Sequence, residues 1–258
     1  MKHRIQRHDM SKAWLRSRVP PSLLYRYRNS KRSIEIWRTT CIVTNFEKAD
    51  CSVLINPCNP KLSGVRNFPY FPRGGPVPDE SPETMHKDWQ PLGFVSQWGG
   101  MEVGTGMMFP VSVVDGLVHQ LGGMRLEVEC RFKQAMAGGG EACPVGQVVL
   151  TSAGGLKPAY EVIVHTTPPF FKHDSDPTNN LRSCYKNSLQ AAFTRKHSRV
   201  ACPLLGAGAR GFAEPSAVDV AIEMTKQWTT EDSPREQAIV FGVMEQSIAD
   251  LLIERLDE

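Results

Sequence analysis

Short, continuous apolar runs alternate along most of this chain with segments in which apolar residues recur every three or four positions. The apolar runs occupy 33–37, 52–56, 147–151, 161–165, 200–205 and 238–243. The segments of helical periodicity occupy 113–121, 126–136, 181–196, 215–228 and 246–256. Short continuous runs are typical of strands buried on both faces of a largely parallel sheet. The alternation therefore predicts an α/β fold with a parallel or mixed central sheet.

The composition is that of an ordinary globular protein, with 41% hydrophobic and 22% charged residues. No apolar run approaches the roughly 20 residues that cross a bilayer, and residues 1–18 lack the apolar stretch of a secretory signal. The 7 cysteines include no C-x-x-C pair, so we expect buried reduced thiols rather than a disulfide framework or a structural zinc site. These features predict an intracellular protein of the cytoplasm or nucleus that does not contact a membrane.

Two segments stand apart from the alternating pattern. Residues 1–32 contain ten lysines and arginines against the single acidic residue Asp9, and we interpret them as a basic extension. A nucleic-acid contact, an organelle-targeting peptide and a solvated arm all fit that charge. Residues 65–110 are rich in proline, glycine and aromatic residues, which predicts an insertion packed on the domain rather than a disordered linker. The domain itself is predicted to span 33–258.

A glycine-rich loop at 206–211, with the sequence GAGARG, lies between a predicted strand and a predicted helix. Glycines allow positive φ angles and close approach of the backbone to a ligand, and successive N–H groups in such a loop suit phosphate oxygens. A tight turn without a ligand is the alternative. The letters also match the dinucleotide fingerprint of Rossmann domains, but only a helix, a strand and a last helix follow the loop here.

Several separated segments resemble the macro domain family, and they occur in the family's order. They are VLINPCN at 53–59, VDGLVH at 114–119, GQVVLT at 146–151, LKPAY at 156–160, VIVHT at 162–166, LRSCYKNSL at 181–189, and the glycine loop followed by Phe212. The resemblance implies a three-layer α/β/α macro domain with a mixed central sheet. It also implies an ADP-ribose cleft at the C-terminal ends of the strands, where open α/β sheets place ligands in general.

The resemblance implies roles for particular residues. Asn59 would bind the distal ribose, and Asp115 would orient or activate a water, which makes these two the catalytic candidates. Asn45 would contact the adenine amino group, with Phe46 beside it, and Phe212 would pack on the adenine. The diphosphate would be wrapped by Gly206, Ala207, Gly208, Ala209, Arg210 and Gly211. The resemblance implies neither a metal nor another cofactor.

Structural interpretations of the same residues stay open. Asn59 is able to cap the turn after its strand, Asp115 to cap its helix, and Phe212 to belong to the core. We assign His119 and His165 to structure, because neither has a partner at metal-ligand or nucleophile spacing.

The sequence also departs from the family pattern at three places. Asn45 replaces the usual aspartate, and Pro110–Val114 replaces a glycine triplet. Arg210 stands where an aromatic residue often covers the distal ribose. That arginine suits a phosphate clamp, a ring stack or a solvated position at the rim of the cleft.

The leading functional hypothesis is a macro domain that binds ADP-ribose or mono-ADP-ribosylated protein and hydrolyses mono-ADP-ribose linkages or ADP-ribose derivatives without a metal. The first alternative is a reader of ADP-ribosylated proteins that catalyses no reaction. The second alternative is a module that binds poly(ADP-ribose) or RNA through its basic N-terminus.

Overall fold

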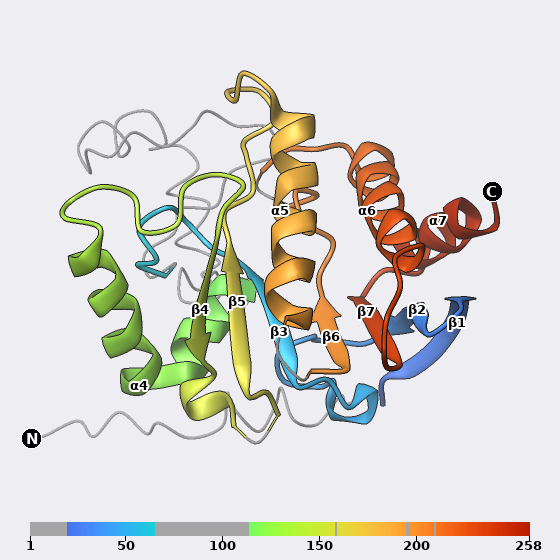
Figure 1. The fold of residues 1–258 in the computed structure, drawn as a ribbon, viewed down its shortest axis with the longest axis horizontal. Coiled ribbons are helices and arrows are strands. Elements are labelled where there is room, and N and C mark those ends of the chain that lie inside the picture. The colour runs from blue at the N-terminus through green and yellow to red at the C-terminus, as the bar shows by residue number, and fades with distance from the viewer. Residues whose placement is uncertain (1–19, 65–113, 158, 195–196, 209) are drawn as a thin grey trace, which may run out of the picture.

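The computed structural model describes residues 20–64, 114–157, 159–194, 197–208 and 210–258 (Figure 1). Residues 1–19 of the predicted extension, the predicted insertion at 65–110 and the site candidate Ala209 lie outside this part of the chain. The strands are β1 Ser22–Asn29, β2 Arg32–Arg38, β3 Val53–Pro57, β4 Val148–Ser152, β5 Val162–Thr166, β6 Arg199–Cys202 and β7 Gln237–Val243. The helices are η1 Glu47–Ala49, α4 Val114–Met136, η2 Gly154–Leu156, α5 Pro177–Phe193, α6 Glu214–Thr229 and α7 Gln246–Asp257.

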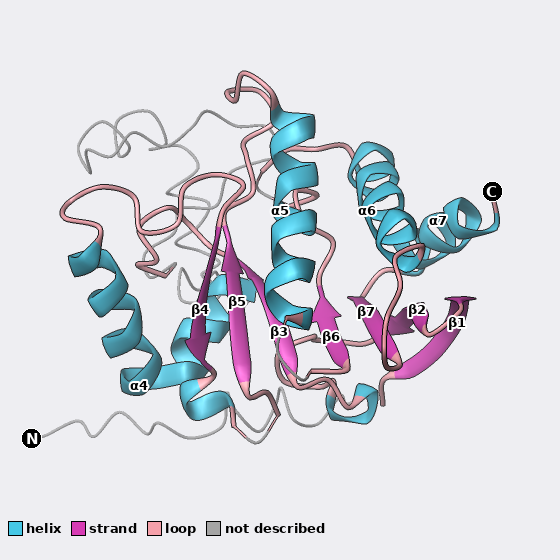
Figure 2. Cartoon of the chain, viewed as in Figure 1, coloured by secondary structure: helices cyan, strands magenta, loops and turns pink. Residues whose placement is uncertain are grey.

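The strands form one mixed sheet in the order β1-β2-β7-β6-β3-β5-β4. The five central strands are parallel to one another, whereas β1 and β4 pair antiparallel at the two edges. Figure 2 shows β4 running against its neighbour β5. The predicted α/β fold with a mixed sheet is therefore confirmed.

The predicted domain boundary at Ser33 is wrong, because the sheet begins earlier in the chain. Residues 22–29 form β1, which pairs with β2 through a tight turn at Ser30 and Lys31. The basic residues Arg26 and Arg28 therefore belong to an edge strand, not to an extension. Edge strands often carry positive charge, which discourages pairing with another chain.

Alternate side chains of the central strands enter two different cores, as expected for a sheet covered on both faces. Val53 and Ile55 of β3 pack with α5, α6 and α7, which lie in front of the sheet in Figure 1. Leu54, between them, packs with residues of α4 and η2 on the other face. The result is the predicted three-layer α/β/α arrangement.

The label α4 covers two helical segments, which are separated by the break that the sequence predicts. Gly123 has non-helical angles, with φ 61° and ψ −158°, between the two predicted helical segments. The turn at η2 packs against this break. A side chain at Gly154 would place its Cβ 2.5 Å from the carbonyl oxygen of Gly122. Glycine is therefore required at position 154 for α4 and η2 to pack this closely.

The loops that follow the parallel strands all leave from one edge of the sheet, called here the C-terminal edge. They carry Asn45 after β2, Asn59 after β3 and the glycine loop after β6. The start of α4, with Asp115, reaches the same edge, since Asp115 bonds to Asn56 of β3. Among the described helices, none combines the length and the apolar character that a membrane span requires.

Candidate functional site

The glycine loop between β6 and α6 has the backbone conformation that its sequence predicts. Gly206 and Gly211 have positive φ angles of 85° and 84°. A Cβ at Gly206 would lie 3.0 Å from the ring of Phe212 and 3.2 Å from Leu181, whereas one at Gly208 would meet nothing within 4 Å. The loop therefore packs tightly on the core at Gly206 and is open at Gly208.

The loop also holds backbone N–H groups that are available to an anion. The N–H of Gly211 donates to the carbonyl of Gly208 at 3.1 Å, and that of Phe212 to the carbonyl of Gly206 at 3.2 Å. The N–H groups of Ala207 and Gly208 donate to no other described residue. Unpaired N–H groups in a glycine turn at the end of a parallel strand suit phosphate oxygens.

Arg210 connects the glycine loop to the loop that carries Asn59. Its Nη2 donates to the carbonyl of Cys58 at 2.9 Å, and its guanidinium lies 4.3 Å from the centre of the Phe170 ring. Burial lowers the pKa of Arg210, while nearby acidic groups, Asp115 among them, oppose that shift. Of the three predicted roles, the ring stack is the one seen here, and a solvated arginine at the rim is not.

Asn59 holds its own loop in shape. Its Oδ1 accepts hydrogen bonds from the backbone N–H groups of Lys61 at 3.1 Å and Ser63 at 3.2 Å, and from the Ser63 hydroxyl. The turn-capping interpretation therefore describes this oxygen. The predicted ribose contact through Asn59 stays a prediction.

Asp115 is the second residue of α4 and is buried, with 4% of its surface exposed. Its Oδ1 accepts a hydrogen bond of 2.7 Å from the Nδ2 of Asn56, the residue that ends the buried part of β3. The same Nδ2 lies 3.1 Å from Nδ1 of His165 on the neighbouring strand β5. Sequence reasoning missed Asn56, although its position inside an apolar strand marked it as a buried polar group that needs partners.

The two histidines that we assigned to separate structural roles lie together beside Asp115. His119 is one helical turn after Asp115, and its Nε2 is 3.5 Å from Oδ1 of that carboxylate. One possible ligand atom from each of Asp115, His119 and His165 lies within 4.8 Å of the others. The expectation that neither histidine has a partner at metal-ligand spacing is therefore wrong. Only the fold brings β5 next to the start of α4.

His165 is held in one orientation and one protonation state. Its Nε2 lies 2.9 Å from the hydroxyl of Thr151 on β4, and its ring has no exposed surface. Burial, followed by the proximity of His119, lowers the pKa of His165 to about 3. The imidazole is therefore neutral at physiological pH.

The residues predicted for the adenine side are buried in the two cores. Phe46 packs edge-on against Trp37 with ring centres 6.1 Å apart, and Phe212 packs against Phe171 at 5.0 Å. Only 1% of Phe212 is exposed, so the core interpretation describes its ring, and Phe46, with 3% exposed, is buried as well. Asn45 braces the loop after β2, because its Nδ2 donates to the Thr40 hydroxyl at 2.7 Å. An adenine contact through these residues stays a prediction.

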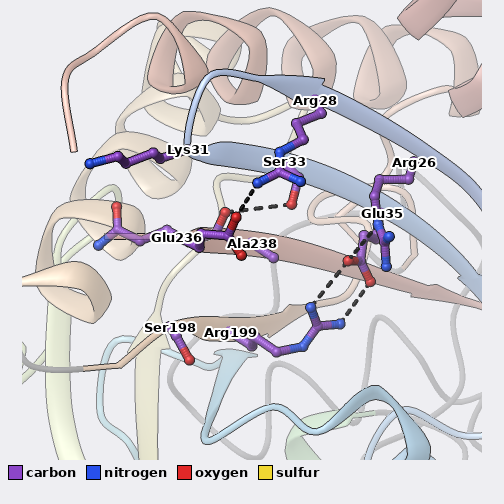
Figure 3. A pocket seen from close by; sticks show the side chains of 10 residues that line it. Arg26, Arg28, Lys31, Ser33, Glu35, Ser198, Arg199, Glu236 and Ala238 are labelled. Atoms are coloured by element: carbon purple, nitrogen blue, oxygen red, sulfur yellow. Dashed lines mark hydrogen bonds and ion pairs between the residues drawn. The ribbon is translucent and has the colours of Figure 1, made fainter. Parts of the chain in front are cut away.

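A cavity of about 340 Å³ lies at the opposite edge of the sheet, where β2, β6 and β7 begin (Figure 3). Its charged groups bond mainly to one another. Arg199 binds the Glu35 carboxylate at 2.7 and 3.1 Å, and Arg26 binds it at 3.0 Å. Arg28 pairs with Glu236 across the cavity. The cavity is therefore lined by ion pairs that satisfy one another, away from the glycine loop.

Comparison with known proteins agrees with this architecture. The Macro domain family profile matches residues 106–221. An O-acetyl-ADP-ribose deacetylase of Klebsiella pneumoniae is 32% identical over 136 residues, which cover 53% of this chain and 75% of that protein. A macro domain-containing protein of Listeria monocytogenes is 35% identical over 120 residues, 46% of this chain. The match spans 65% of the length of the Listeria protein.

The fold also resembles solved structures over nearly the whole chain. The Oceanobacillus iheyensis macrodomain with ADP superposes with a TM-score of 0.64 at 19% identity, covering 92% of this chain and 96% of that one. The fold thus defines a three-layer α/β/α protein with a glycine-rich turn at its C-terminal edge. Together with the sequence matches, it shows that this chain belongs to the macro domain family.

Proposed function

We propose that this protein binds ADP-ribose at the C-terminal edge of the sheet, with the diphosphate on the glycine loop. The observation that carries the proposal is that the N–H groups of Ala207 and Gly208 donate to no other described residue. They lie in a loop that has positive φ angles at Gly206 and Gly211. A diphosphate would accept hydrogen bonds from these groups and gain from their dipoles. The distal ribose would then point toward Asn59 and Asp115.

We further propose that the protein hydrolyses an ester on the distal ribose of an ADP-ribose derivative. The similarity to the Klebsiella deacetylase supports this reaction class. Water would add to the ester carbonyl, and the bond between the acyl carbon and the ribose oxygen would break. The products would be a carboxylic acid and a free ribose hydroxyl. Asp115, held by Asn56, would orient the water and accept its proton, and the loop N–H groups would keep the diphosphate in place.

Calorimetric titration with ADP-ribose tests the binding step. Saturable heat in the micromolar range is expected, and no heat at millimolar ligand contradicts the proposal. Mass spectrometry of O-acetyl-ADP-ribose incubated with the protein tests the chemical step. Asp115→Ala is expected to slow release of acetate by about 100-fold or more, in line with the usual contribution of a general base. Asp219→Ala, which removes an exposed carboxylate paired with Arg255, is the matched control and should leave the rate unchanged.

A reader that binds ADP-ribosylated protein without catalysis is the second candidate. The burial of Asp115 favours it, since only 4% of this residue is exposed and its Oδ1 is occupied by Asn56. The same two experiments separate the candidates. ADP-ribose binding without any release of acetate, or of ADP-ribose from a mono-ADP-ribosylated protein, would identify the reader.

A further inference from the structure

Three metal-ligating side chains meet beneath the proposed ADP-ribose cleft, at the junction of α4 and β5. Asp115 and His119 project from consecutive turns of α4, and His165 comes from β5, the strand between β3 and the edge strand β4. The 3.5 Å between Asp115 Oδ1 and His119 Nε2 is close to the separation of two ligands on one tetrahedral ion, about 3.3 Å for bonds of about 2.0–2.1 Å. The first pair of the three is therefore already spaced for a metal.

His119 provides a second, independent sign that something is bound there. Only 7% of its side chain is exposed, and neither ring nitrogen makes a hydrogen bond within the described part of the chain. Leaving a buried polar group unpaired is costly, and native proteins rarely do so. Gly64 closes one side of the ring, since a Cβ there would lie 2.6 Å from His119 Cγ. The imidazole thus lies buried beside the Asp115 carboxylate, and among the described residues no hydrogen bond satisfies either ring nitrogen.

His165 has the surroundings of a metal-binding histidine. When Nε2–H donates to the Thr151 hydroxyl, Nδ1 is left as an acceptor on the side of Asp115. A hydrogen bond from the far ring nitrogen is the usual way in which proteins orient a ligating imidazole. Thr151 is therefore a positioning residue for this nitrogen.

Asn56 completes the donor set. Its Nδ2 bridges Asp115 and His165, while its Oδ1 is buried without a hydrogen bond among the described residues. Rotating the amide would place the oxygen where the nitrogen now lies, facing the carboxylate and Nδ1 of His165. Two acceptors would then repel this oxygen, unless a cation lay between them. The pocket therefore fits two arrangements. In one, Asn56 Nδ2 donates hydrogen bonds as it does now; in the other, Asn56 Oδ1 is the fourth ligand of a metal ion.

From this geometry we propose that Asp115, His119 and His165 bind one Zn²⁺ ion beneath the cleft, with Asn56 Oδ1 or a water as the fourth ligand. Two imidazole nitrogens and a carboxylate are ligands typical of Zn²⁺, whereas Mg²⁺ and Ca²⁺ favour sites made of oxygens. The widest pair of ligand atoms, now within 4.8 Å, would close by at most about 1.5 Å on binding. The proposed hydrolysis also uses Asp115, but this inference is tested separately from it, because metal binding is measured in the absence of any substrate.

Titration of the metal-free full chain with Zn²⁺, followed by calorimetry and a competing chelator, tests the proposal. We expect one ion per chain with a Kd of about 1 µM or tighter. Substitution of Co²⁺ should give the visible absorption of a tetrahedral N/O site. Intense near-ultraviolet charge-transfer bands would instead show that cysteine thiolates bind the ion, and would overturn the assignment to these three residues. A wild-type chain that takes up no metal would overturn it as well.

Matched variants locate the ion. His119→Gln should weaken Zn²⁺ binding at least about 100-fold, and Thr151→Val about 10–100-fold through loss of the orienting bond. His173→Gln, which changes an exposed histidine, should bind Zn²⁺ as the wild type does. Circular dichroism and melting curves confirm that each variant is folded. If folded His119→Gln and Thr151→Val both keep wild-type affinity, the site is not here. Calorimetry with ADP-ribose on the same samples reports separately on the proposed function.

Discussion

The C-terminal edge of the sheet and the opposite edge, where the parallel strands begin, differ in how their polar groups are satisfied. At the edge where the parallel strands begin, a cavity of about 340 Å³ is lined by charges that pair with one another, such as Arg199 with Glu35. At the C-terminal edge, the loop N–H groups of Ala207 and Gly208 and the ring nitrogens of His119 make no hydrogen bond to another described residue. The comparison shows that open volume alone does not identify a binding site. Polar groups that the fold positions and leaves unpaired are the better indicator.

Removing the buried carboxylate at the cavity edge should give the largest loss of stability. Glu35→Ala leaves Arg26 and Arg199 without their shared partner, and Glu35 is only 1% exposed. We expect a loss of about 3 kcal/mol in the free energy of unfolding, the lower end for a broken buried pair, because both arginines retain contact with solvent. Urea denaturation measures this. ADP-ribose affinity should be unchanged. A large drop in affinity would contradict the conclusion that the cavity edge is not the ligand site.

The exposed ion pair of Arg28 and Glu236, which lines the same cavity as Glu35, provides the control. Glu236→Ala removes a carboxylate that is 76% exposed and paired with Arg28. Surface ion pairs contribute at most about 1 kcal/mol, so the unfolding free energy should change little. Equal effects of the two substitutions would show that burial of Glu35 is not what stabilises this edge.

Substitutions at two glycines of the glycine loop should distinguish the effect of packing on stability from the effect of ligand contact on affinity. Gly206→Ala forces a side chain into a left-handed conformation 3.0 Å from the Phe212 ring, and should cost about 2 kcal/mol of stability. Gly208→Ala adds a methyl group to open space and should leave the melting temperature nearly unchanged. If the loop binds a diphosphate, Gly208→Ala should nevertheless weaken ADP-ribose binding in calorimetry. Unchanged affinity in this variant would argue against the proposed phosphate contact.

Replacing Arg210, which connects the glycine loop to the loop that carries Asn59, should have a smaller effect on ADP-ribose affinity. Arg210→Lys keeps the charge but loses the flat stack on Phe170 and the geometry of the bond to the Cys58 carbonyl. We expect the Kd for ADP-ribose to rise about 5-fold, equivalent to about 1 kcal/mol. Arg182→Lys changes an arginine of α5 that pairs with Glu223 of α6; it is the control and should bind as the wild type does. A rise in Kd for both variants would point to a general effect of charge.

Acid should destabilise the cavity edge through Glu35, by less than its removal does. Burial alone would raise the pKa of Glu35, but hydrogen bonds from Arg199 and Trp37 and the charges of both arginines outweigh it and lower the pKa below its ordinary value of 4.5. A lowered folded-state pKa stabilises the protein above pH 4.5, and this contribution is lost as the pH falls through the lower value. Melting temperatures from pH 6 to pH 3 should show this loss, and Glu35→Gln should reduce it. The same slope in both proteins would exclude Glu35 as its source.

Much of the fold follows from local patterns in the sequence. The apolar runs of β3 and β7 and the fourfold spacing in α5 predicted those elements within a few residues. The break at Gly123 also followed from the two predicted helical segments. The boundary at Ser33 was wrong, because the pattern of β1 is dominated by charge and its pairing with β2 is what makes it a strand. Charge on an edge strand does not distinguish it from a solvated arm.

The glycine loop and the cluster around Asp115 also differ in how far local sequence patterns predicted them. The glycine loop was predicted from its letters and its position, because positive φ angles need glycine and this requirement is local. Sequence reasoning missed the cluster of Asn56, Asp115, His119 and His165, although all four residues lie in segments that it singled out. Asp115 and His119 are one helical turn apart, but His165 joins them only because β5 lies beside β3 in the sheet. Contacts between distant segments depend on strand order, which no local pattern contains.

By itself, then, the sequence determined the α/β class, the family resemblance and a loop with the backbone freedom to hold phosphate. The tertiary structure decided which polar groups would be buried together and which would be left unpaired. It placed Phe46 and Phe212 in the cores and Arg210 on Phe170. The physical reason is that propensity and periodicity act along the chain, whereas burial and hydrogen-bond partners are set by the packing of one element on another.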